Sequence, residues 1–129
     1  MKIVLTSVFV NDQEEARQVY TKKLGFVSRQ DQPLGKFRFL TVAEPHRPDG
    51  PEILLEPNDN PAARTYQRAM FAQGIPVASF GVDDVAGEYE RLKGHGLQFT
   101  MPPTRLGPVT LAVFDDTCGN LIQIAERHP

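Results

Sequence analysis

Several features that would place the sequence in a specialised class of protein are scarce. Cys118 is the only cysteine among 129 residues, so no disulfide forms within the chain, which is typical of a reducing cytosol. The formal net charge of −2 leaves no basic excess of the kind that binds nucleic acid or an anionic membrane. No apolar run approaches the ~20 residues needed to span a bilayer. We therefore expect a cytoplasmic protein with neither a nucleic-acid nor a membrane partner.

Short motifs that identify a particular chemistry are also missing. The sequence has no phosphate-binding loop, no dinucleotide-binding Gly-x-Gly-x-x-Gly run, no nucleophile elbow and no zinc-ligand spacing. It does have an ordinary globular composition, with 40% apolar and 23% charged residues, and a length that suits one compact domain. The function must therefore be sought in how the chain is organised.

The chain contains the same unit twice. The run Ser7–Asp12 is echoed 72 residues later by Ser79–Asp84, and an amphipathic helix pattern that ends at a glycine follows each copy. Further echoes pair Phe39–Val42 with Thr110–Val113, and Gly50–Leu54 with Gly119–Gln123. An internal repeat indicates the architecture and shows which positions of the two copies correspond.

The first copy predicts a strand, a helix and three more strands. Residues 3–10 are apolar and β-branched, as in a buried strand. Asp12 is the expected N-cap of the helix, Glu15 completes a capping box, and Gly25 ends the helix. The three strands that follow are expected near 26–31, 36–43 and 52–57.

The second copy repeats this order. Asp83 and Asp84 are interpreted as a helix cap, Gly96 ends the helix, and Asp115 and Asp116 are interpreted as a turn rather than a catalytic pair. The strands of this copy are expected near 76–82, 97–101, 107–114 and 120–126.

The two copies together predict the fold. Module one, residues 1–59, and module two, residues 75–129, are joined by a helical connector, 60–74, which begins with Asn60 followed by proline. We expect a single α+β domain, 1–129, in which two tandem βαβββ modules form an open barrel-like sheet around a cleft. An unrelated α+β domain with an accidental internal match is the alternative.

Several motifs carry a family resemblance. They are Val10–Asp12 with Tyr20–Phe26 in the first copy, and Val82–Val85, Tyr89–Lys93 and Phe114–Ile122 in the second. Together they resemble the vicinal oxygen chelate superfamily, which contains glyoxalases, bleomycin-resistance proteins and extradiol dioxygenases. The resemblance covers nearly the whole chain and implies paired βαβββ modules around a cavity, and a homodimer. It does not imply one chemistry, because the superfamily includes lyases, isomerases, oxygenases and plain binding proteins.

For metal-dependent members, the resemblance implies a divalent ion held by His, Gln or Glu side chains from four strands, two in each module. The corresponding positions here are Leu5, Leu54, Val77 and Gln123. Three of these side chains are hydrocarbon, and a single amide oxygen does not hold a metal ion tightly. We therefore expect no metal and no other cofactor at the usual site.

The register of the fourth strand leaves an alternative open. Sliding this strand by two residues puts Glu52 or Glu56 in place of Leu54, on the same strand face. Either carboxylate, with Gln123, would then belong to a non-standard metal site, or would act as a general base.

Other side chains have both a structural and a functional interpretation. Gln123 either bonds to neighbouring backbone or contacts a ligand. Arg38 either lies on a solvated strand face or binds a carboxylate or phosphate of a ligand. Phe39 and Phe80 belong to the core or line a cleft that suits a flat apolar ligand. Cys118 is either inert or a nucleophile.

The leading hypothesis is a metal-independent protein that sequesters a mostly apolar small molecule, similar to the bleomycin-resistance branch. The predicted ligand-binding residues are Gln123, Arg38, Leu5, Leu54, Val77, Phe39 and Phe80. The alternative is a glyoxalase- or dioxygenase-type lyase or isomerase that uses a non-standard divalent-metal site or a carboxylate base. No residue is assigned a catalytic role.

Overall fold

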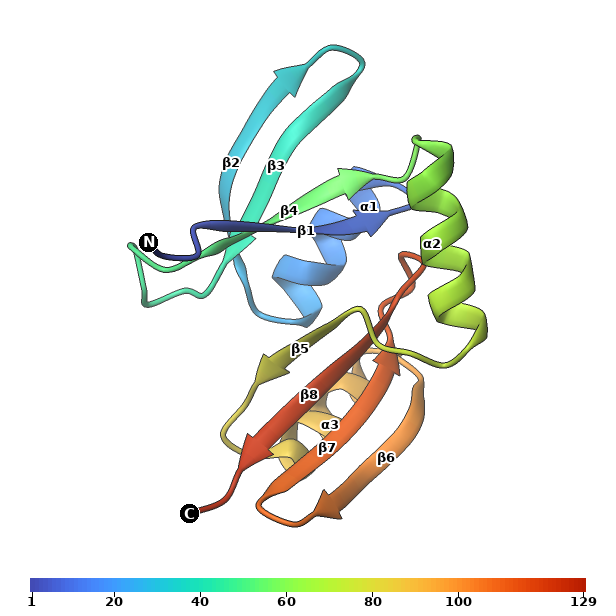
Figure 1. Ribbon diagram of the computed structural model, residues 1–129. Coiled ribbons are helices and arrows are strands. Elements are labelled where there is room, and N and C mark those ends of the chain that lie inside the picture. The colour runs from blue at the N-terminus through green and yellow to red at the C-terminus, as the bar shows by residue number, and fades with distance from the viewer. The chain divides into compact units, whose positions relative to one another are not determined.

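Each copy of the repeat folds into its own four-stranded sheet. The computed structural model describes all residues, Met1–Pro129, and they form two compact units: unit 1, Met1–Tyr66, and unit 2, Gln67–Pro129. In chain order the elements are β1 Leu5–Val10, α1 Gln13–Gln18, η1 Val19–Lys23, β2 Val27–Leu34, β3 Phe37–Ala43, β4 Glu52–Pro57, α2 Pro61–Ala72, β5 Ala78–Gly81, α3 Val85–Gly94, β6 Phe99–Leu106, β7 Val109–Asp115 and β8 Leu121–Arg127. The strand orders are β1-β4-β3-β2 and β5-β8-β7-β6 (Figure 1). The predicted α+β class and the two βαβββ modules are confirmed, and the strands form two four-stranded sheets that do not close into a barrel.

Helix α1 begins where the sequence predicts. Asp12 has an extended backbone, and its carboxylate accepts a hydrogen bond from the Glu15 amide at 2.8 Å, so it is the N-cap. The π-helical turn η1 continues the helix, and Gly25 follows with a φ of 94°, which glycine adopts without strain. Ala16 and Tyr20 are fully buried and form the apolar stripe that packs on the sheet.

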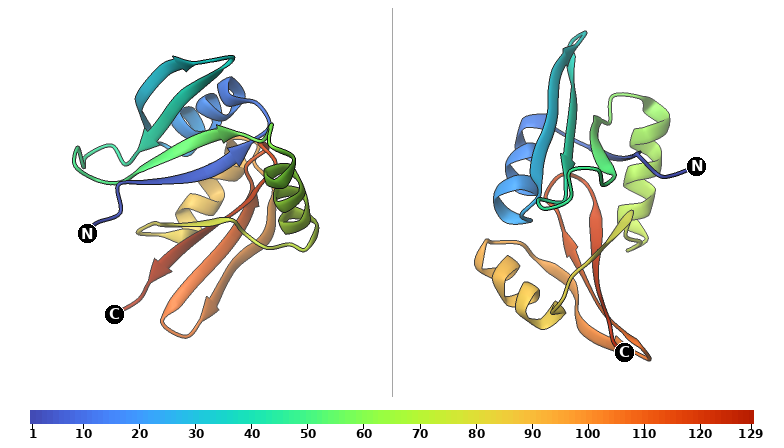
Figure 2. Two further views of the ribbon diagram at one scale, coloured as in Figure 1. Left: turned by 45° about the horizontal axis from the view of Figure 1, so that its top comes forward. Right: turned by 90° about the vertical axis from the view of Figure 1, so that its left-hand side faces the viewer.

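The sheet of unit 1 has one face covered by α1 and η1 (Figure 2). The strand side chains on that face are buried, namely Val8, Val10, Leu40, Val42 and Leu55. The opposite face, which we call the open face, carries Leu5, Ser7 and Phe9 of β1, Glu52, Leu54 and Glu56 of β4, and Phe37, Phe39 and Thr41 of β3. The core of unit 1 therefore lies between helix and sheet, and a ligand site is to be sought on the open face.

Unit 2 repeats this arrangement with α3 on its sheet. The buried side chains between them are Val85, Leu92, Ala112, Phe114, Ile122 and Ile124. Tyr89 of α3 packs edge-on against Phe99, with 4.6 Å between the ring centroids. Asp84 stands at the N-cap but its side chain makes no capping bond; Glu126 of β8 accepts from the Val85 amide instead, at 3.0 Å. The predicted cap position is right, but the capping carboxylate comes from the sheet.

A buried carboxylate holds the turn between β7 and β8. Asp116 is fully buried and accepts hydrogen bonds from the main-chain amides of Cys118 at 2.7 Å and Asn120 at 3.0 Å, and from the Asn120 side chain at 2.9 Å. Gln67 of α2 donates to the Cys118 carbonyl and to the Asn120 side chain. Asp115 accepts one further main-chain bond within the turn. Both aspartates therefore serve the turn, as the sequence predicts.

The strand pairings test the register of the repeat. Ser7 of β1 pairs with Leu54 of β4. Ser79, which is 72 residues later, pairs with Gln123 of β8. The first and fourth strands of the two modules therefore correspond as the sequence echoes predict.

The predicted correspondence between the third strands of the two modules is wrong by one residue. Thr41 of β3 pairs with Leu54, whereas Val113 of β7 pairs with Gln123, so Thr41 corresponds to Val113. The sequence echo matched Thr41 with Ala112. A slip of one residue moves every side chain of a strand to the other face, and apolar similarity alone does not detect it when both faces are largely apolar.

Strand β6 also differs from its prediction. It runs over Phe99–Leu106 rather than 97–101, although Pro102 and Pro103 lie within it. The pairing with β7 shifts register between Met101 and Thr104, so both prolines fall in an irregular stretch that requires no ladder hydrogen bond from them.

Helix α2 begins with the predicted cap. The Asn60 side chain accepts a hydrogen bond from the Ala62 amide at 2.9 Å, and Pro61 is the first helical residue. Gly74 has a φ of 74° and follows the end of the helix. None of the helices has the length and apolar character required to cross a membrane.

Candidate ligand-binding site

Strands β3 and β4 separate at one end of the open face. They make three residue pairs, from Thr41 with Leu54 to Ala43 with Glu52, whereas β7 and β8 pair at seven positions. Figure 1 shows the β2–β3 hairpin diverging from β4 beyond these pairs. The separation opens a gap in the sheet of unit 1 that the sheet of unit 2 does not have.

The side-chain amide of Gln13 bridges the two strands across this gap. Its Nε2 donates to the carbonyl oxygens of Arg38 at 2.7 Å and Leu55 at 2.8 Å, and its Oε1 accepts from the Arg38 amide at 3.0 Å. Buried main-chain groups need hydrogen-bond partners. Because the buried Gln13 side chain supplies them, the two strands separate without leaving these groups unsatisfied. The corresponding first residue of α3 is Val85, which has no side-chain amide to offer.

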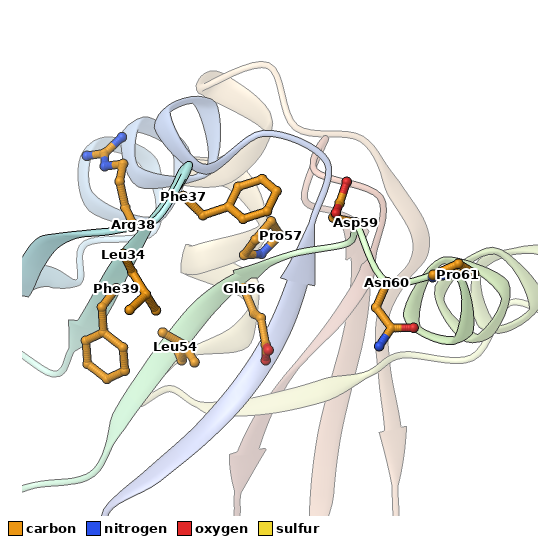
Figure 3. A pocket seen from close by; sticks show the side chains of 10 residues that line it. All are labelled: Leu34, Phe37, Arg38, Phe39, Leu54, Glu56, Pro57, Asp59, Asn60 and Pro61. Atoms are coloured by element: carbon orange, nitrogen blue, oxygen red, sulfur yellow. The ribbon is translucent and has the colours of Figure 1, made fainter.

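A pocket of about 570 Å³ lies where the strands separate (Figure 3). It is lined by Leu34, Phe37, Arg38, Phe39, Leu54, Glu56, Pro57, Asp59, Asn60 and Pro61. Leu34, Phe37, Phe39 and Leu54 form apolar walls, and the entry to α2 forms a polar edge. The volume is in the ordinary range for small-molecule sites, roughly 300–1,000 Å³.

Two carboxylates of the pocket differ in their surroundings. The Asp59 carboxylate lies 3.7 Å from the Lys36 ammonium. This ammonium also lies over the Phe37 ring, 5.1 Å from the ring centroid. Glu56 shares the open face with Leu54 and makes no hydrogen bond or ion pair within unit 1. The pocket therefore has apolar walls and one carboxylate that the protein itself does not neutralise.

A polar cluster lies beside the pocket on the open face. Glu52 accepts a hydrogen bond from the Thr41 hydroxyl at 2.6 Å and another from the Gln30 amide at 2.9 Å, both at the same oxygen. The bond from Thr41, and then the bond from Gln30, holds the pKa of Glu52 below its usual value. The Glu52 carboxylate is therefore stabilised in its charged form and fixed in orientation.

The guanidinium of Arg38 lies on the helix side of the sheet. It donates to Asp31 at 2.9 and 2.6 Å and to Glu14 of α1 at 2.9 Å. The hydrogen bonds with Asp31 and then Glu14 raise the pKa of Arg38. In Figure 3 the guanidinium points away from Glu56. The ligand contact predicted for Arg38 stays a prediction, and its charged group already has two carboxylate partners.

The four positions expected to hold a metal ion carry side chains that do not fit one. Leu5 and Leu54 lie on the neighbouring strands β1 and β4 of unit 1, and Leu54 lines the pocket. In unit 2, Val77 precedes β5, and Gln123 donates its amide hydrogen to the Ser79 hydroxyl at 2.8 Å. Within either unit no three His, Cys, Asp or Glu side chains gather as metal ligands would. Hydrocarbon side chains and one amide do not supply the donor set of a divalent cation.

The remaining predicted residues divide between the pocket and the interior. Phe39 lies in the pocket wall. Phe80 alternates with Ser79 on β5 and pairs with Ile124, so it lies on the α3 side of its sheet, away from Gln123, which favours the core interpretation. Cys118 is buried in the turn before β8.

Some pocket residues were not predicted from the sequence. Leu34 falls beyond the expected end of the second strand at residue 31, because β2 continues to the hairpin turn. Asn60 was identified only as a helix cap. The alternation of side chains along a strand could have predicted Phe37, because it is two residues from Phe39 and therefore lies on the same strand face.

Comparison with protein families and sequences agrees with this fold. The model of the Glyoxalase/Bleomycin resistance protein/Dioxygenase superfamily matches residues 2–124. The uncharacterized protein YurT of Bacillus subtilis (strain 168) is 56% identical over 127 residues, which cover 98% of this chain and 100% of YurT. The uncharacterized protein YetH of the same organism is 30% identical over 129 residues, covering 97% of this chain and 98% of YetH.

Solved structures are similar over almost the whole chain. UcmS2 has a TM-score of 0.84 at 29% identity, with 98% of both chains covered. TnmS3, an antibiotic binding protein from Streptomyces sp. CB03234, has a TM-score of 0.78 at 27% identity, covering 98% of this chain and 96% of TnmS3. The family expected from the sequence motifs is therefore confirmed, and the chain belongs to the Glyoxalase/Bleomycin resistance protein/Dioxygenase superfamily.

Proposed function

We propose that the protein binds and sequesters a mostly apolar small molecule in the pocket of unit 1, without a metal ion. The observation that carries this proposal is the separation of β3 from β4, which leaves a cavity of about 570 Å³ walled by leucine and phenylalanine. Burial of apolar surface in a cavity of matching shape is sufficient for binding. Hydrocarbon side chains at Leu5, Leu54 and Val77 are compatible with that role.

The similarity to TnmS3 supports the same class of function. TnmS3 is described as an antibiotic binding protein, and the similarity extends over 98% of this chain. Holding a small molecule is the role that this similarity supports. The pocket volume suits a molecule of drug size.

The test uses Nile red, a neutral apolar dye whose fluorescence rises when it leaves water. We expect saturable binding to the purified protein, unchanged within about twofold after dialysis against EDTA. The variant Leu54→Arg places a charge in the pocket wall and should lower the affinity by about tenfold or more. The matched control is Leu106→Arg, at a leucine of unit 2 that is 55% exposed.

Two results would contradict the proposal. One is equal dye binding by wild type and Leu54→Arg, which would place the dye elsewhere. The other is stoichiometric metal in the purified protein, measured by mass spectrometry, whose removal abolishes binding. Circular dichroism of both arginine variants separates loss of the pocket from loss of the fold.

A further inference from the structure

Glu56 is an anion placed among apolar groups. It lies on the open face of β4, two residues from Leu54, and lines the pocket together with Phe37 and Phe39. Figure 3 shows its carboxylate turned away from Arg38 and toward the same side of the strand as Leu54. Within unit 1 it has no hydrogen-bond or ion-pair partner.

The cations near the pocket are already bound to other groups of unit 1. Arg38 binds Asp31 and Glu14 on the far side of the sheet. Lys36 lies beside Asp59 and is largely exposed. Arg64 of α2 donates to the main-chain carbonyl oxygen of Asp59 at 2.6 Å. None of these side chains forms a hydrogen bond or ion pair with Glu56, so the negative charge of Glu56 is not compensated from within unit 1.

This placement discriminates between ligands by charge. A neutral apolar ligand that fills the pocket removes water from Glu56 and offers nothing in return, which is unfavourable. An anionic ligand adds repulsion. A ligand with a protonated amine or quaternary ammonium group pairs with the carboxylate and also gains from the faces of the phenylalanine rings.

A second carboxylate reinforces this preference. Glu52 lies four residues before Glu56 on the same face of β4, about 13 Å away along the strand. Thr41 and Gln30 bind one of its oxygens and hold it in place. The open face therefore presents negative charge on both sides of Leu54.

We infer that the natural ligand is a cation: a flat or apolar body that carries a basic nitrogen, whose charge is recognised by Glu56. This inference rests on the proposed function, since it names the chemical class of the molecule that the same pocket holds.

Three probes that share the acridine ring test the inference near neutral pH. These are 9-aminoacridine, which is a cation, acridine, which is neutral, and acridine-9-carboxylate, which is an anion. We expect the cation to bind wild-type protein about tenfold more tightly than acridine, and the anion to bind least, as measured by fluorescence titration. Glu56→Gln should remove the preference, because it should lower the affinity for the cation alone. Glu90→Gln, an equal loss of charge on the exposed surface of α3, should leave it unchanged.

The outcomes separate this inference from the proposed function. Equal binding of the three acridines, or a preference that survives in Glu56→Gln, overturns the inference while pocket binding of Nile red still stands. If none of the acridines binds but Nile red does, the inference is likewise overturned and the proposed function stands. Failure of every probe, Nile red included, overturns the proposed function and the inference together.

Discussion

The side-chain nitrogen of Gln13 donates a hydrogen bond to the carbonyl oxygen of Leu55 at 2.8 Å. The same nitrogen donates to the Arg38 carbonyl, so one helical residue joins two strands that have stopped pairing with each other. The gap that it spans is the place where the pocket lies. A single buried amide therefore supports the opening of the sheet in unit 1.

Replacing Gln13 by valine, the residue found at the corresponding position of the second copy, should damage both stability and binding. The change leaves the main-chain groups of Arg38 and Leu55 without partners, at a cost of about 1–3 kcal/mol in the free energy of unfolding. Urea denaturation measures this cost, and Nile red titration measures the affinity of the pocket for the dye. The control is Gln18→Val on the same helix, because Gln18 bonds only to the exposed Glu14. Equal effects of the two variants would show that the bridge is unimportant.

Asp116 should be far more sensitive to substitution than its neighbour Asp115. Asp116→Ala removes three buried hydrogen bonds from the turn before β8, and we expect a loss of about 2–4 kcal/mol in the free energy of unfolding. Asp115→Ala removes one exposed turn bond and should cost about 1 kcal/mol or less. Thermal and urea unfolding of the two variants compare these values. A larger loss for Asp115→Ala would contradict the role given to the buried carboxylate.

Removing the Thr41 hydroxyl should change how stability depends on pH. Because the folded-state pKa of Glu52 lies below its unfolded value, the stabilisation is complete above the unfolded value, about 4.3, and is lost as the pH falls through the folded pKa. In Thr41→Val the pKa of Glu52 should rise, so the difference in stability from wild type narrows in acid. Carboxyl NMR titration and urea unfolding at several pH values measure both effects. Thr41→Ser keeps the hydroxyl and should behave as wild type. A difference that stays constant into acid would refute the link to Glu52.

Arg38→Met tests the ligand contact that the sequence suggested for this residue. The guanidinium is committed to Asp31 and Glu14, so its loss should change Nile red affinity by less than about twofold. The partly exposed ion pairs should contribute no more than about 1 kcal/mol to stability. A marked loss of dye affinity with an intact fold would restore Arg38 as a ligand-binding residue.

Local signals in the sequence predicted the elements well. Asp12 and Asn60 have side chains that cap a helix from a few residues away, and Gly25 takes a backbone conformation that other residues avoid. These effects act within a few residues along the chain, so the sequence pattern alone contains them. The repeat added the correct correspondence of Ser7 with Ser79.

The pocket was harder to predict because it depends on distant partners. Gln13 looks like an ordinary polar residue in the first turn of a helix, yet its partners are 25 and 42 residues away. Arg38 has apolar neighbours on both sides, and only the position of α1, which brings Glu14 near, decides which face its side chain takes. The sequence contains these residues but not the tertiary contacts that give them their roles.

The bridge made by Gln13 has a consequence for how the pocket changes size. Strands joined by a main-chain ladder keep a fixed spacing of about 4.8 Å, which no substitution of side chains alters. Where a side chain joins them, the spacing follows the length and torsion angles of that one residue. The width of the gap in unit 1 should therefore depend on the side chain at position 13, whereas the spacing of the fully paired strands should not.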